Sequence, residues 1–302
     1  MLTSDLLTDI ERRAAIPLAQ TTFQSTDIYQ MIDRETESKM TPLILRCMSE
    51  YMVADYPYNI TAGQALYAIP SRAVAGKLRD VQIIQSNNPD SISPLQRLDF
   101  SDLYASTSGT FRVLVQKTGF YIEGNYIRMY PTPQNTSNII NLSYYIRPNT
   151  CVDPSMCAQI QSINTSTNVV TVVSAPANIT TSTPIDFVNA LPGFECKAIN
   201  QVITNVGSNT YTFSSLPGNL SVGDYVCQAT QTCVVQIPQE LLGLLSQYVT
   251  VRVLSAQGDA QAYQQALNEL KTLEENAMML IAPRVDGKLV RVTNSKGISR
   301  FV

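Results

Sequence analysis

Residues 119–130 read GFYIEGNYIRMY. Apolar and polar residues alternate on either side of Gly124-Asn125, with the period of two that is typical of a β-strand. Two residues of this type between alternating runs indicate a tight hairpin. We therefore expect strands over Gly119–Glu123 and Tyr126–Tyr130, ended by the Pro131-Thr132-Pro133 segment.

The segments next to this hairpin also have strand-like patterns. We expect strands over Tyr51–Tyr58, Ala65–Ile69, Leu78–Ile84 and Ile139–Ile146, and a short helix over Pro94–Tyr104. Together these segments predict an antiparallel β domain.

Helical patterns precede and follow this β domain. Ser4 can cap a first helix that ends before Pro17, and Ser25 or Thr26 can cap a second helix that Pro42 interrupts. After Pro238 the pattern predicts a helix over 239–256 and then a break at Gly258-Asp259. The next helix carries an apolar stripe at spacings of three and four residues, which suits packing on the preceding helix as a helical hairpin. Its stripe consists of Tyr263, Ala266, Leu270, Leu273, Ala277 and Leu280.

Residues 151–233 have a different composition and a weak internal repeat. Five of these 83 residues are charged, against 40 of the remaining 219. The stretch 168–178, NVVTVVSAPAN, resembles 209–219, NTYTFSSLPGN, and 185–188, IDFV, resembles 223–226, GDYV. A duplicated β-meander explains the repeat, with each half supplying one sheet of a small sandwich or barrel.

The expected fold class is therefore α+β, a helical bundle or hairpin core with an antiparallel β domain and an inserted all-β sandwich or barrel. Residues 1–150 form the N-terminal helices and the β domain, and 151–233 form the insert. Residues 234–282 form the C-terminal helical hairpin, and 283–302 form an extended basic arm.

Composition excludes several functions. The chain has 302 residues and no His, which rules out a Ser-His-Asp triad, a Cys-His dyad and imidazole metal ligands. Its net charge of −3 argues against a globally basic nucleic-acid binder. We expect no secretory signal and no membrane span, because the N-terminus lacks a basic and apolar leader and the apolar run 277–282 is too short.

Six cysteines are the first candidates for chemistry. Cys151 and Cys157 lie at one end of the insert and Cys227 and Cys233 at the other, so the two pairs should lie near each other. A four-thiolate zinc site is conceivable, but structural zinc pairs usually have two to four intervening residues and these have five. Disulfides would need an oxidising medium. We favour small buried apolar residues, and expect no metal and no cofactor.

Acidic side chains and the basic end of the chain offer further candidates. Asp33, Glu35 and Glu37 fit a solvated helix face. The last 20 residues carry five basic residues against Asp286 alone, and three interpretations stay open: an arm that docks on a partner, a DNA-backbone contact, or a solvated terminus. We favour the docking arm, whose candidate residues are Arg284, Lys288, Arg291, Lys296, Arg300 and Phe301.

Outside the insert, the order of segments resembles the head-to-tail adaptor, or connector, proteins of tailed bacteriophages, particularly the podovirus-like ring proteins below the portal. The resemblance lies in 21–28 (TTFQSTDI), 121–133 (YIEGNYIRMYPTP), 142–148 (LSYYIRP) and 237–241 (IPQEL), and in the helix pair around Gly258-Asp259. The insert departs from the short adaptors.

The resemblance implies a structural virion protein without enzymatic activity, made in the host cytoplasm and placed at the head–tail interface. It implies a homo-oligomeric ring of twelve copies that binds the portal on one side and the tail tube or nozzle on the other. DNA would pass through the lumen without specific binding, and no membrane is involved. The basic tail would dock on the portal, and the helix bearing Tyr263, Leu270, Leu273 and Leu280 would pack in the ring.

One alternative is a virion surface or tail component. Its inserted β domain, rich in Asn, Ser and Thr and poor in charge, would then bind a receptor or a glycan.

Overall fold

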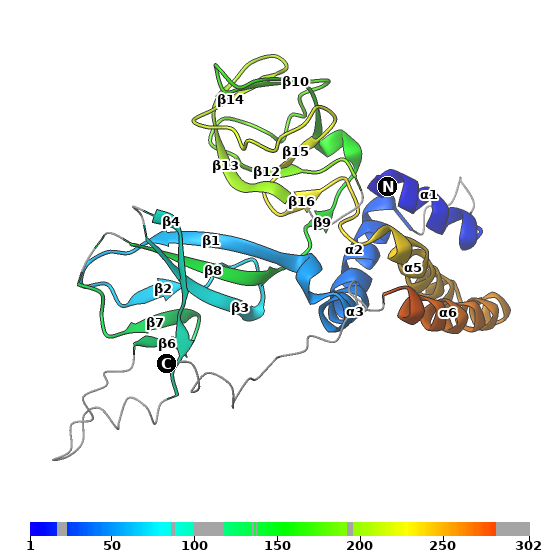
Figure 1. Ribbon diagram of the computed structural model, residues 1–302. Coiled ribbons are helices and arrows are strands. Elements are labelled where there is room, and N and C mark those ends of the chain that lie inside the picture. Colours follow the sequence, from blue (N-terminus) through cyan, green and yellow to red (C-terminus); the bar gives the residue numbers. More distant parts are fainter. Residues whose placement is uncertain are drawn as a thin grey trace, which may run out of the picture.

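The computed structural model describes residues 1–16, 23–85, 88–99, 118–134, 136, 138–191 and 196–281. Figure 1 shows three parts: a helical body, a β body of two sheets, and a β-barrel beside them. The fold class is α+β with an inserted β domain, as the sequence predicts. Within these residues, no helix has both the length and the apolarity to cross a lipid bilayer.

The helical body combines helices from the N-terminal part of the chain with α5 and α6, which follow the barrel in the sequence. It contains α1 (Thr3–Arg13), α2 (Ser25–Glu35), α3 (Thr41–Cys47), α5 (Leu242–Gln257) and α6 (Ala260–Leu280). Leu6, Ile10 and Ile32 are fully buried on the apolar faces of α1 and α2, which both contact α5. A π-helical turn, Thr36–Met40, connects α2 to α3 and places Pro42 in the first turn of α3, where proline needs no N–H partner.

The predicted helical hairpin of α5 and α6 is confirmed. Gly258 ends α5 in the left-handed conformation at φ +79°, and the Asp259 carboxylate begins α6 by accepting hydrogen bonds from the amides of Gln261 and Ala262. Ala266, Leu270 and Ala277 of the predicted stripe are buried, and Tyr263 and Leu273 are partly buried against the same core.

The β body is built from two four-stranded sheets, which Figure 1 shows as two layers. In the first, β1 (Val53–Asn59), β8 (Asn138–Ile146), β3 (Ala73–Gln85) and β4 (Asn88–Pro94) are neighbours in that order. The second has the order β2 (Leu66–Ala68), β7 (Tyr126–Tyr130), β6 (Gly119–Glu123) and β5 (Gln96–Arg97). One hydrophobic core, with Ile127 and Tyr144 fully buried in it, continues from both sheets into the helices.

The hairpin predicted from residues 119–130 is confirmed with its expected boundaries. Glu123 pairs with Tyr126 across Gly124-Asn125, and Gly124 has a φ of +59°, which a residue with a Cβ rarely adopts.

The prediction of a helix over Pro94–Tyr104 is wrong for residues 94–99, which the structure describes as strands and their connection. Pro94 ends β4, and Gln96 and Arg97 form β5, which runs parallel to β6. The strand pairing is tight at Gly119, where an added Cβ would lie 2.3 Å from the Gln96 carbonyl oxygen. Tertiary pairing has therefore overridden the local pattern. Residues 100–104 lie outside the described part of the chain.

The insert forms a closed barrel with the strand order β10-β11-β14-β13-β12-β15. The strands are β10 (Ala158–Asn164), β11 (Val169–Val172), β12 (Pro184–Val188), β13 (Cys196–Val206), β14 (Thr210–Phe213) and β15 (Tyr225–Gln228). Its own hydrophobic core is separate from that of the helices and sheets.

The duplication is visible in the barrel, but the expected division into one sheet per half is wrong. Counterpart strands of the two repeats pair with each other, β11 with β14 and β12 with β15. Val169 pairs with Thr212. The residues that correspond to these two across the repeats, Thr210 and Thr171, also pair. Such interleaving lets each short half cover the apolar face of the other.

Candidate functional site at the junction of the barrel and the core

Three segments that are distant in the sequence meet where the barrel joins the helices. The entering strand β9 (Thr150–Cys151) runs parallel to the leaving strand β16 (Gln231–Thr232), and the Val152 amide donates to the Thr232 carbonyl at 2.9 Å. The N-terminal residues join this pair, because the Thr3 amide donates to the Cys233 carbonyl at 2.9 Å. The barrel is therefore held by both its stems and by the start of the chain.

A buried ion pair connects the barrel directly to the β body. Arg72 lies just before β3, and its Nη1 and Nη2 atoms lie 3.0 and 2.7 Å from the two carboxylate oxygens of Asp186 in β12. Asp186 is fully buried and Arg72 is 8% exposed. Because two parallel N–H···O bonds fix both position and angle, this bidentate pair orients the barrel on the core.

Polar neighbours complete the coordination of the Asp186 carboxylate. It accepts hydrogen bonds from the amides of Asn200 and Thr230 and from Nδ2 of Asn149, each at 3.0 Å. Asn149 also accepts a hydrogen bond from Arg72. A buried carboxylate needs this number of donors to remain charged without a large desolvation cost.

The other half of the barrel contains a corresponding carboxylate with a different partner. Asp224 occupies the position in the second repeat that Asp186 occupies in the first, and it is 2% exposed. Its cation is Lys197 of the barrel itself, at 2.8 Å. Of the two equivalent carboxylates, Asp224 thus pairs with a cation of the barrel, and Asp186 pairs with a cation of the β body.

Helix α2 adds a further contact to the entering stem. Asp33 Oδ1 accepts a hydrogen bond from the Cys151 amide at 2.8 Å. Burial raises the pKa of Asp33 to about 6. Glu35 is 6% exposed and forms an ion pair with Arg252 of α5. The expectation that Asp33 and Glu35 lie on a solvated face is therefore wrong, because tertiary packing covers this side of α2.

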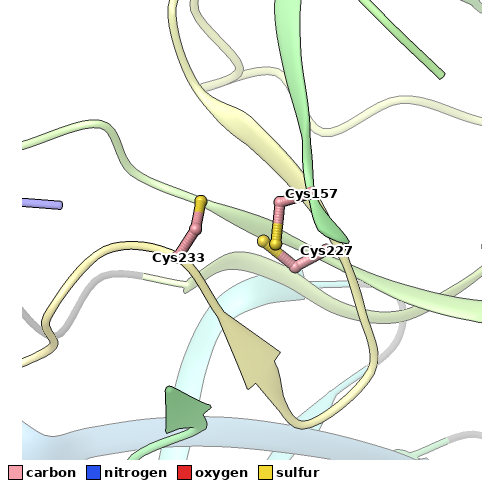
Figure 2. Close-up of side chains that lie close together, drawn as sticks. All are labelled: Cys157, Cys227 and Cys233. Atoms are coloured by element: carbon pink, nitrogen blue, oxygen red, sulfur yellow. The ribbon is translucent and has the colours of Figure 1, made fainter. Parts of the chain in front are cut away.

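Three of the cysteines form a compact buried cluster, which we call the thiol cluster: Cys157, Cys227 and Cys233. Their Sγ atoms all lie within 4.8 Å of one another, and Figure 2 shows the sulfur atoms of Cys157 and Cys227 side by side with Cys233 next to them. Hydrogen bonds from the Cys157 and Cys227 thiols lower the pKa of Cys233, whereas burial raises the pKa of Cys227.

The remaining cysteines have other environments. Cys151 lies near the cluster but outside it, and Cys196 Sγ accepts a hydrogen bond from Gln236 at 3.2 Å. The sequence therefore predicted the approach of the two cysteine pairs correctly, but three rather than four thiols converge.

The residues expected to make assembly contacts differ in how far the chain itself buries them. Leu270 is buried within its own chain, Tyr263 and Leu273 are partly buried there, and Leu280 is 64% exposed. The arm residues, from Arg284 to Phe301, lie outside the described residues. The sequence patterns did not connect Arg72, Asn149 and Asp186, although an Asp at the same position of both nearly uncharged repeats was a usable signal.

The model of the family described as SU10 adaptor protein matches residues 1–177, more than half of the chain. No curated protein matches the chain.

Proposed function

Because the chain belongs to the SU10 adaptor protein family, a family of structural adaptors in tailed bacteriophages, we propose that it forms a ring that joins the portal to the tail. The ring consists of twelve identical copies around a lumen through which the genome leaves. Identical head-to-tail contacts close into such a ring when the rotation between neighbours completes a circle. The family match over residues 1–177, which include α1, α2, α3 and both sheets of the β body, is the single observation that carries this proposal.

The exposed end of α6 supports a contact between neighbouring copies. Met278, Met279 and Leu280 are 47%, 76% and 64% exposed at consecutive positions. A cluster of exposed apolar side chains is typical of an interaction surface. Since Leu270 faces its own core, the ring contact of α6 uses this end and the uncovered side of the helix rather than the buried stripe.

The basic arm, 283–302, docks on the portal in this proposal. Its five cations, Arg284, Lys288, Arg291, Lys296 and Arg300, would meet an acidic surface, and Phe301 would fill an apolar pocket. The tail tube or nozzle binds the opposite side of the ring. The net charge of −3 per chain favours passage of DNA without retention, and the coupling needs no bond-making chemistry.

Native mass spectrometry of the full chain, with and without purified portal, tests this function. We expect a twelve-copy ring that gains portal subunits. A chain truncated after Ala282 should still form rings but lose portal binding. A chain that stays monomeric with and without portal would refute the ring, and undiminished portal binding by the truncated chain would refute the arm.

A substitution at the exposed helix end separates ring contact from folding. Met279→Ser should weaken ring assembly but leave monomer unfolding unchanged, because this side chain contributes little to the core. Leu270→Ser serves as the contrast, since it should destabilise the chain itself. Rings of unchanged abundance in Met279→Ser would contradict the proposed contact.

A second function, receptor or glycan binding by the barrel, is favoured by one observation. The barrel exposes Val173, Leu191, Val202 and Val222, each more than half accessible, on a surface with few charges. Binding of assembled rings to host-cell glycans, with loss on replacing Leu191 by Ser, would support it. Absence of binding would leave the barrel as a structural part of the ring.

A further inference from the structure

The thiol cluster lies at the base of the barrel, and its members come from three separate segments. Cys157 directly precedes β10, Cys227 lies in β15, and Cys233 follows β16. Ala158 pairs with Val226, so one step along the same antiparallel register places Cys157 opposite Cys227. Cys233 approaches this cross-strand pair from the leaving stem, as Figure 2 shows.

The unusual spacing of the cysteines follows from this arrangement. The five residues between Cys227 and Cys233 form the end of β15, the turn that follows it and β16, and they bring the Cys233 thiol back to the Cys227 thiol. The site is thus assembled by strand register rather than by a short metal-binding turn. The five-residue spacing of the cysteines is therefore no reliable argument against a metal site.

The distances suit a metal ion. With Zn–S bonds of about 2.3 Å, tetrahedral ligands have sulfur atoms about 3.8 Å apart. All three Sγ pairs already lie within 4.8 Å. Side-chain rotations that shorten these separations by about 1 Å or less would let all three sulfur atoms bind one ion without a change in strand register.

The surroundings also match those of bound thiolates. The side chains are 7%, 0% and 0% exposed, so little solvent competes with the sulfur atoms for a bound ion. Cys196 provides the contrast, since its thiol interacts with the side-chain amides of Gln236 and Asn149 rather than with other thiols.

We propose that Cys157, Cys227 and Cys233 bind one zinc ion. Among the described residues, no further Cys, Asp or Glu belongs to the group, so water supplies the fourth ligand. Each sulfur binds as a thiolate and forms one Zn–S bond, any remaining thiol proton passes to solvent, and no oxidation state changes. The ion connects β10, β15 and the segment that pairs with the N-terminus, and thereby fixes the base of the barrel. This inference does not depend on ring formation.

The test uses the full chain, purified under reducing conditions without a polyhistidine tag. The chain has no His, so such a sample has no competing imidazole ligands. Elemental analysis after equilibration with zinc should give one ion per chain. Cobalt(II) in place of zinc should give thiolate charge-transfer absorption together with the intense visible bands of tetrahedral coordination.

Variants locate the site. Cys233→Ser should weaken zinc binding by at least roughly tenfold, since even changes outside the first shell cost that much. Cys47 is not a member of the cluster, so Cys47→Ser is the matched control and should bind zinc as the unmodified chain does. The cobalt spectrum of the unmodified chain gives an answer even where a variant fails to fold.

Three results would overturn the proposal. The first is a fully reduced chain that takes up neither zinc nor cobalt. The second is binding that Cys233→Ser leaves unchanged. The third is an intact mass lower by two hydrogens with a Cys157–Cys227 crosslinked peptide, which would show that the cross-strand pair forms a disulfide instead.

Discussion

Replacing Arg72 by Met removes the cation of the Asp186 pair while keeping most of the apolar length of the side chain. The carboxylate then stays in a site with no exposure to solvent. Breaking a buried ion pair on one side costs about 3–5 kcal/mol, because the remaining charge is left without compensation.

The surviving contacts of Asp186 narrow this range. Its carboxylate keeps the donors from Asn149, Asn200 and Thr230, so the loss should lie near the lower limit. We expect a destabilisation of about 3 kcal/mol, which corresponds to roughly a hundredfold change in the equilibrium between docked and undocked barrel.

Hydrogen exchange and far-ultraviolet circular dichroism measure the effect. The chain lacks Trp, so circular dichroism replaces tryptophan fluorescence in denaturant titrations. Exchange should accelerate most at the amides of Val152 and Thr230, which make hydrogen bonds at the two stems. Amides in the middle of the helical hairpin should change least.

Two further variants make the result decisive. Arg128→Met removes an exposed ion pair with Glu123 and should change the stability little, because solvent screens both charges. The double variant Arg72→Met with Asp186→Asn should recover part of the loss, because no unpaired charge remains. If Arg72→Met costs no more than Arg128→Met, the ion pair does not anchor the barrel.

Two other predictions concern the helical body. Because the pKa of Asp33 is raised above its ordinary value to about 6, the folded state retains this proton more strongly than the unfolded state, and stability from this group should fall as pH rises from about 4 to about 6. Asp33→Asn should abolish that part of the pH dependence in denaturant titrations, and an unchanged slope would contradict it. Gly258→Ala forces a residue with a Cβ to adopt φ +79° and should cost about 1–2 kcal/mol in thermal unfolding. Gly218→Ala is its control, since that glycine has open space and no positive φ, and equal losses in the two variants would refute the role of Gly258.

Patterns that depend on neighbouring residues were predictable from the sequence. The hairpin over 119–130 and the break at Gly258-Asp259 both follow from turn chemistry within a few residues, and both are present. The helix prediction for segment 94–99 was wrong because the structure of this segment depends on a distant residue. Its strand β5 exists because Gln96 pairs with Gly119, and no local pattern contains that contact.

The residues at the junction of the barrel and the core were even harder to predict from local patterns. Arg72 and Asp186 are 114 residues apart, and their pairing depends on how the barrel is placed on the core. The convergence of the thiols was predictable in outline from the two ends of the insert. Which three converge was not, because it is set by the register of β10 and β15.

The ion pairs of the duplicated barrel predict that this insert is held in one orientation on the core. Two equivalent buried carboxylates each need a cation, and within the barrel Lys197 neutralises only Asp224. Asp186 depends on Arg72, so any rotation of the barrel away from the β body leaves a buried charge unpaired. The stems β9 and β16, paired in parallel, resist the same movement. In a ring, each barrel would therefore keep a fixed direction relative to its helices, and forces applied at the barrel would be transmitted to the core.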